Sequence, residues 1–181
     1  LDVSRVIEAA ENGETAQLEM ELGTLRRLTG EAKALAVAAA VKEEFDCGLD
    51  KVVIAFWHKD VGALLKSALS TYGVAMIDGS TSHKDRELAV ERFRDDATCR
   101  VFLGQIQAAG EAIDLSAAAE LIFAETSLIP KDMKQMALRI TNHTQARLPR
   151  VRVAALEGSF DETLQNILMR KWSAIREVKQ T

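Results

Sequence analysis

The sequence is poor in the residues that build covalent or metal-based frameworks. Its 181 residues include only two cysteines and three histidines. Cys47 and Cys99 form no Cys-x-x-Cys pair, and no two histidines have the i, i+4 spacing that places both rings on one helix face. We therefore predict that the chain has neither a disulfide framework nor a metal site. We also expect it in a reducing compartment, cytoplasmic or otherwise intracellular.

Long apolar runs and secretory features are also missing. No uninterrupted apolar stretch approaches the ~20 residues that a membrane-spanning helix needs. The first residues show no basic start followed by an apolar run, as a secretory signal would. The chain begins with Leu1 rather than methionine, from which we expect a fragment of a longer protein.

The signatures that hold nucleotide phosphates are absent as well. The sequence has no Gly-x-x-x-x-Gly-Lys-[Ser/Thr], no Gly-x-Gly-x-x-Gly, and no apolar strand that ends in an Asp-Glu pair for Mg²⁺. Asp161 and Glu162 form such a pair, but they begin a helical segment. The chain by itself is therefore not expected to hydrolyse ATP.

The charge is unevenly distributed. The net charge of -4 argues mildly against a nucleic-acid partner for the chain as a whole. Six basic residues between positions 131 and 152 are nevertheless offset locally only by Asp132. They form either a cationic face or the solvated ends of a helix and a strand.

Short apolar runs alternate with helix-period segments after residue 50. In the first such segment we expect Asp60 to cap a helix that is stopped at Gly73. The alternation predicts a doubly wound, mainly parallel α/β sheet flanked by helices. The predicted strands lie at residues 51–57, 73–78, 99–104, 120–125 and 150–157.

The part before residue 50 has a helical pattern throughout. An alanine-rich helix is predicted to begin at Thr29, and further amphipathic segments precede it. We therefore divide the chain into an N-terminal helical extension, residues 1–28, and an α/β domain, residues 29–181.

Polar and small residues follow two of the predicted strands. After residue 77, Gly79 permits a turn, and the next hydroxyls and amides suit a phosphate oxygen. The spacing favours another interpretation, in which Ser82 caps a helix with Asp85 at its third position. Arg86 is then either an internal pairing partner or an outward phosphate contact.

After residue 105, small residues permit close approach of the backbone to a ligand, with Asp114 placed to accept from a sugar hydroxyl. A tight crossover that needs small residues for packing explains them equally well.

Taken in order, these elements resemble the C-terminal RecA-like lobe of Swi/Snf-type superfamily-two DNA helicases and translocases, with annealing-helicase and phage-type members most similar in character. The resemblance runs from about Leu25 to Lys171. It rests on "TGEAKALAV", "KVVIAFWHKDV", "IDGSTSHKDRELAVERFRDD", "AIDL", "LIFAE", Pro130 before Gln135, and "GSFDETLQNILMRK".

The resemblance implies roles for particular residues. Gln105 to Gln107 stand where the family has a Ser-Thr-Arg that couples DNA to nucleotide. The residues implied to approach DNA are His58, Lys59, Ser80, Thr81, Gln105 and Gln107. Gly110 and Asp114 would border ATP, which together with Mg²⁺ is held mainly by a partner N-terminal RecA-like lobe of the same parent chain.

The catalytic part of the resemblance is incomplete. Gln135 and Arg139 match the start of the family's Gln-x-x-x-Arg-x-x-Arg-x-Gly-Gln element, whose arginines reach the γ-phosphate of ATP. The second arginine is Asn142 here, which supplies no charged fork to a phosphate.

Three functions remain open on the sequence. The first is the second motor lobe of an ATP-dependent DNA helicase or translocase. The second is a degenerate, non-catalytic RecA-like interaction module. The third is an unrelated doubly wound domain that binds a small nucleotide at the point where the strand order reverses.

Overall fold

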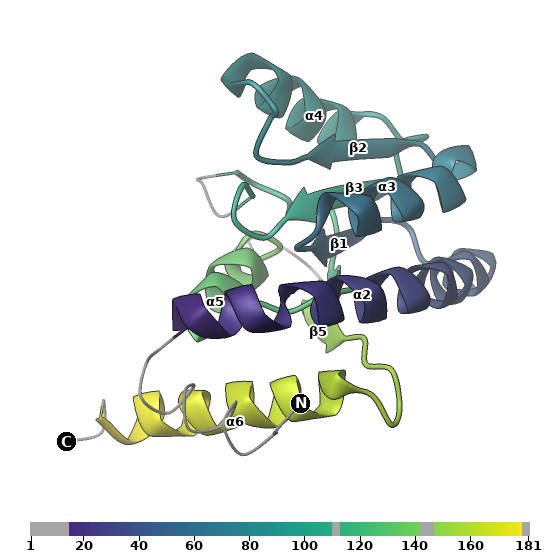
Figure 1. Cartoon of the computed structure of the whole chain (residues 1–181). Coiled ribbons are helices and arrows are strands. Elements are labelled where there is room, and N and C mark those ends of the chain that lie inside the picture. The colour runs from purple at the N-terminus through teal and green to yellow at the C-terminus, as the bar shows by residue number, and fades with distance from the viewer. Residues whose placement is uncertain (1–14, 110–112, 142–146, 179–181) are drawn as a thin grey trace.

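Five short strands form one sheet. The computed structural model describes residues 15–109, 113–141 and 147–178. Its strands are β1 (Val52–Phe56), β2 (Val74–Ile77), β3 (Val101–Gln105), β4 (Glu120–Phe123) and β5 (Arg150–Val153). All neighbours run parallel, in the spatial order β2-β3-β1-β4-β5 (Figure 1). Each strand overlaps one of the five apolar runs, so the predicted parallel α/β sheet is confirmed.

Helices cover both faces of the sheet. They are α2 (Thr15–Asp46), α3 (Lys59–Ala68), α4 (His83–Asp95), α5 (Pro130–Leu138) and α6 (Phe160–Val178), with a short 3₁₀ helix, η1 (Ser70–Tyr72). α2 and α3 pack on one face, α4 and α5 on the other, and α6 contacts α2 and α5 (Figure 1). Among the described helices, none is both long enough and apolar enough to cross a membrane.

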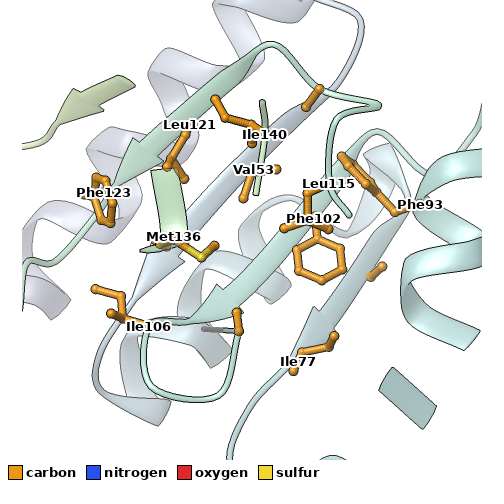
Figure 2. Packing of buried hydrophobic residues seen from close by; sticks show 14 of the residues in the cluster. Val53, Ile77, Phe93, Phe102, Ile106, Leu115, Leu121, Phe123, Met136 and Ile140 are labelled. Atoms are coloured by element: carbon orange, nitrogen blue, oxygen red, sulfur yellow. The ribbon is translucent and has the colours of Figure 1, made fainter. Parts of the chain in front are cut away.

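The central strands β3, β1 and β4 are mainly apolar on both faces because both faces are covered, whereas β5 is largely exposed. All five residues of β1 are buried. On the α4 and α5 side, Val53, Phe102 and Leu121 share a core with Phe93 and Met136 (Figure 2). The opposite side chains of the same three strands pack against α2 and α3.

α2 passes without a break through the position where a helix start was predicted. Thr29 Oγ1 donates to Leu25 O at 2.9 Å, one turn back, instead of capping a new helix. The prediction of a helix that begins at Thr29 is therefore wrong. α2 includes residues on both sides of position 28, and the division of the chain into two parts remains a prediction.

The first crossover helix begins earlier than predicted. The N-cap of α3 is His58, and Asp60 lies in the first helical turn, so the prediction that Asp60 caps this helix is wrong. After η1 the chain turns at Gly73, where φ is +63° and an added Cβ would lie 2.2 Å from Thr98 O. Glycine alone fits this turn. α3, however, already ends at Ala68, and Gly73 caps η1, so the prediction that this helix stops at Gly73 is wrong.

A buried ion pair joins α2 to α6. Lys33 Nζ lies 2.6 Å from Asp161 Oδ2, and the two side chains are 7% and 9% exposed. Lys33 Nζ also donates to Ala154 O at 3.0 Å, and Leu156 N donates to Asp161 Oδ2 at 3.2 Å. The loop before α6 is therefore held by the same two charges.

Removal of one partner should be far more harmful than removal of an exposed pair. We expect Asp161→Ala to lower the free energy of unfolding by about 3–5 kcal/mol, because it leaves the buried Lys33 charge unpaired. Urea denaturation of the chain measures this change. In the control Glu31→Ala, which removes a more exposed partner of Arg27 on the same helix, the loss should stay below about 1 kcal/mol. Equal losses in the two variants would contradict the prediction.

Candidate nucleic-acid interface

The carboxyl ends of neighbouring strands lie at one edge of the sheet because all strands are parallel. Phe56 at the end of β1 lies beside Gln105 at the end of β3, and Ile77 at the end of β2 lies beside Gly104. The loops that follow carry most of the residues that the sequence assigns to DNA. We call this group the carboxyl-edge surface; it consists of His58, Lys59, Ser80, Thr81 and Gln105.

Gln105 joins the loops that follow β1 and β2. Its Nε2 donates to Trp57 O at 2.8 Å, and its Oε1 accepts from Gly79 N at 2.8 Å. Two backbone groups from different loops therefore fix the orientation of this amide. Gln107, in contrast, is exposed in the turn that follows β3.

Glu125, just after β4, holds the loop after β1 from the other side. Its Oε2 accepts from Trp57 N and His58 N, both at 2.8 Å, and its Oε1 lies 2.6 Å from His58 Nδ1. The guanidinium of Arg26 in α2 lies 5.0 Å from the centre of the Trp57 ring. His58 is thus anchored within the protein, whereas the side chain of Lys59 is 56% exposed.

Asp78 organises the loop that carries the two predicted hydroxyls. Its Oδ1 accepts from Ser80 N at 2.8 Å, from Ser80 Oγ at 2.6 Å and from Thr81 Oγ1 at 3.3 Å. The pKa of Asp78 lies below its ordinary value mainly because the Ser80 hydroxyl donates to it, with smaller effects of Ser80 N, Lys59 and Thr81. A phosphate at this loop therefore has to compete with Asp78 for the hydroxyl protons.

The start of α4 resolves two alternatives. Ser82 Oγ accepts from Asp85 N at 3.2 Å and donates to Asp85 Oδ2 at 2.7 Å, so the predicted cap is confirmed. Arg86 donates from Nε to Thr81 O at 3.1 Å and from Nη1 to Ala108 O at 2.9 Å. These bonds favour the interpretation of Arg86 as an internal partner, which ties the loop after β2 to the turn after β3.

Asp114 and Arg139, both assigned to the ATP site, lie on adjoining segments. Leu115 N donates to Arg139 O at 2.9 Å, so the end of α5 lies beside the segment that contains Asp114. Asp114 is exposed, and its pKa is lowered mainly by a hydrogen bond from the Ser116 side chain and then by Ser116 N. Gln135 lies one turn before Arg139, as the helical spacing predicts.

Two assigned positions cannot be placed. Gly110 and Asn142 lie outside the described residues.

Next to Asp114, a hollow of about 540 Å³ is lined by side chains of both charge signs. Its lining residues are His83, Arg86, Glu87, Val90, Glu91, Arg94, Ile113 and Asp114. Within residues 15–109, 113–141 and 147–178, no three His, Cys, Asp or Glu side chains gather in a way that could hold a metal ion.

Sequence reasoning missed two residues that organise this edge, Asp78 and Glu125. Each is the first carboxylate after a buried apolar strand run, and that signal could have drawn attention to them. Their partners were not foreseeable from local patterns, because Glu125 bonds to residues 67 and 68 positions away.

Comparison with known proteins identifies relatives. The family model of the helicase conserved C-terminal domain matches residues 39–144. The chain is 28% identical over 124 residues to the ATP-dependent helicase FUN30 of Saccharomyces cerevisiae, covering 67% of this chain and 11% of that protein. It is 33% identical over 95 residues to the human DNA annealing helicase and endonuclease ZRANB3, covering 52% of this chain and 9% of that protein. The chain thus spans about a tenth of the length of these relatives.

A solved structure supports the fold. The Sulfolobus solfataricus SWI2/SNF2 ATPase core in complex with dsDNA aligns with 97% of this chain and 41% of that one, with a TM-score of 0.71 and 17% sequence identity. At this identity the likeness concerns the fold alone, and it confirms the expected RecA-like lobe.

The hydrogen bonds around Asp78 predict a pH dependence of its loop. Because the pKa of Asp78 is lower in the folded loop than its ordinary value of 3.8, the loop bonds are complete above pH ~4 and are lost as the pH falls through the folded-state value. A carbon-13 NMR titration of this carboxyl should have its midpoint below 3.8. In Asp78→Asn, the Ser80 amide signal should no longer follow this titration. A midpoint at or above 3.8 would show that the loop bonds do not favour the ionised form.

Proposed function

Since the chain belongs to the helicase conserved C-terminal domain family, as the match over residues 39–144 shows, we propose that it is the second motor lobe of a Swi/Snf-type, ATP-dependent DNA helicase or translocase. In this role it contributes contacts to the DNA backbone and an arginine to an ATP site between two lobes. It does not hydrolyse ATP by itself. The division into a helical extension, residues 1–28, and a RecA-like domain, residues 29–181, is part of the proposal.

The bonded carboxyl-edge surface is the observation that carries the DNA part of the proposal. Gln105 bridges Trp57 O and Gly79 N, so the loops after β1, β2 and β3 form one fixed arrangement. Lys59 and Ser80 are exposed on this arrangement. A rigid set of polar groups with an exposed ammonium group suits the regular, charged backbone of DNA.

The charges of this surface suit weak binding that is sensitive to salt. Lys59 Nζ lies 3.6 Å from Asp78 Oδ2, so the cation that meets a phosphate has a carboxylate as its neighbour. The carboxylate lowers the local positive potential and competes for the hydroxyl protons of Ser80 and Thr81. Contacts of this kind involve no base edges, and we therefore expect little sequence preference.

The ATP part of the proposal rests on Arg139, with Gln135 beside it. An arginine there stabilises the charge that develops on the transferred phosphoryl group. Asp114, on the segment that the Leu115–Arg139 backbone bond holds next to α5, and Gly110 border the nucleotide. The described residues include no carboxylate or histidine cluster suited to a metal. We therefore assign Mg²⁺ and most of the ATP contacts to the N-terminal RecA-like lobe of the parent chain, which is the proposed protein partner.

The isolated chain should bind duplex DNA weakly. We expect the logarithm of the affinity to fall linearly with the logarithm of the salt concentration, because phosphate contacts release counterions. Lys59→Ala should lower the affinity about twofold to fivefold and reduce the salt slope by about 1. Fluorescence anisotropy with duplexes of different sequence measures both quantities. The control is Lys66→Ala, which removes an exposed lysine from the last turn of the same helix. Affinity that is independent of salt would contradict the proposal.

ATP hydrolysis by the full-length parent protein tests the role of Arg139. If this arginine completes the ATP site, Arg139→Ala should lower DNA-stimulated turnover by about 10³-fold or more, whereas Lys134→Ala on the same helix should leave it unchanged. Turnover that is absent in the natural protein and restored by Asn142→Arg would instead support a non-catalytic interaction module.

A further inference from the structure

Glu125 is a buried carboxyl group. It follows the buried end of β4, and its side chain is 4% exposed. A carboxyl group removed from water is costly unless its oxygens accept hydrogen bonds. The hydrogen-bond partners of Glu125 therefore show which part of the chain this carboxylate holds in place.

The described hydrogen-bond partners of Glu125 all belong to the two residues that follow β1. Trp57 N and His58 N both donate to Oε2 at 2.8 Å, and His58 Nδ1 lies 2.6 Å from Oε1. The two backbone bonds fix consecutive peptide groups. Glu125 thus sets the path of the chain between β1 and α3.

α2 leaves room for this carboxylate. A Cβ added at Gly30 would lie 2.7 Å from Glu125 Oε1 and 2.9 Å from Val61 Cγ2. A larger residue at position 30 would displace the glutamate, α3 or both. The carboxylate therefore lies between α2 and the residues that follow β1, and its position is closely defined.

The start of α3 depends on these bonds. His58 is the N-cap, in an extended conformation with φ -88° and ψ 136°, and its side chain makes no cap hydrogen bond. The imidazole instead faces Glu125. The glutamate therefore fixes the direction in which α3 begins, and Lys59 is the first residue of that helix.

From this arrangement we propose that Glu125 is a positioning residue that holds the Trp57–His58 backbone and so places Lys59 on the carboxyl-edge surface. The effect on DNA binding rests on the proposed function. The effect on the backbone does not, because it concerns only hydrogen bonds within the chain.

Two variants distinguish positioning from a role of the negative charge. Glu125→Gln has the same length and keeps an oxygen for both backbone donors, while its amide is able to donate to an unprotonated Nδ1 of His58. Glu125→Asp keeps the charge but is one methylene group shorter, so its oxygens do not reach the same donors. Positioning predicts that the Gln variant behaves like the natural chain and that the Asp variant is impaired; a charge role predicts the reverse.

The first readout is hydrogen exchange of the Trp57 and His58 amides, measured by NMR without DNA. In Glu125→Asp these amides should exchange about tenfold faster, and in Glu125→Gln within about twofold of the natural rate. The matched control is Glu120→Gln, which alters another carboxylate of the same β4 region, one that pairs with the exposed side chain of Arg150. It should leave the two amides unchanged.

The second readout is duplex DNA binding. Glu125→Asp should weaken binding about threefold, and its combination with Lys59→Ala should be no weaker than Lys59→Ala alone, because both changes act on the same contact. Unchanged amide exchange in Glu125→Asp, or equal acceleration in the Asp and Gln variants, would overturn the positioning role. Additive losses of affinity would overturn the link to Lys59. Failure of the natural chain to bind DNA would reject the proposed function, while the amide exchange would still decide the role of Glu125 in the backbone.

Discussion

The peptide groups of Trp57 are held from two sides, and the carboxyl edge of the sheet depends on this arrangement. Gln105 donates to Trp57 O, and Glu125 accepts from Trp57 N. Because Gln105 also accepts from Gly79 N, side-chain hydrogen bonds connect the ends of β2, β3, β1 and β4 in their spatial order. The loops that follow these strands are therefore joined by a continuous series of hydrogen bonds.

The same arrangement has a consequence for binding. Ser80 and Thr81 already share their protons with Asp78, and Gly79 N is bonded to Gln105. The loop therefore loses little conformational entropy on binding, because its hydrogen bonds already order it in the unbound chain. Each phosphate contact, however, replaces an existing bond or approaches a carboxylate. A loop that is ordered in advance but attracts phosphates only weakly suits a surface that binds DNA and releases it repeatedly, as the proposed motor function requires.

The sequence predicts the parts of this protein that depend on local patterns. Short apolar runs predicted all five strands, including the largely exposed β5, and the Ser82–Asp85 spacing predicted the start of α4. Local patterns failed at a cap-like residue inside a continuous helix, and where contacts between distant residues determine the structure. Thr29 resembles a cap, but its hydroxyl bonds one turn back within α2. The partners of Gln105 lie 26 and 48 positions away, so its resemblance to a DNA-coupling position was visible in the sequence while its bridging bonds were not.

α2 illustrates why the predicted boundary near residue 28 needs a physical test. The helix contributes to the α/β core from Ala34 to Phe45, and its earlier turns also reach the loop after β1. Arg26, before the boundary, contacts the Trp57 ring and donates to Thr126 O, whereas Lys33, after it, pairs with Asp161. Contacts of the same kind thus occur on both sides of position 28. A cut there would remove the cation next to Trp57, and we expect it to loosen the loop that Glu125 and Gln105 hold while the sheet itself remains folded.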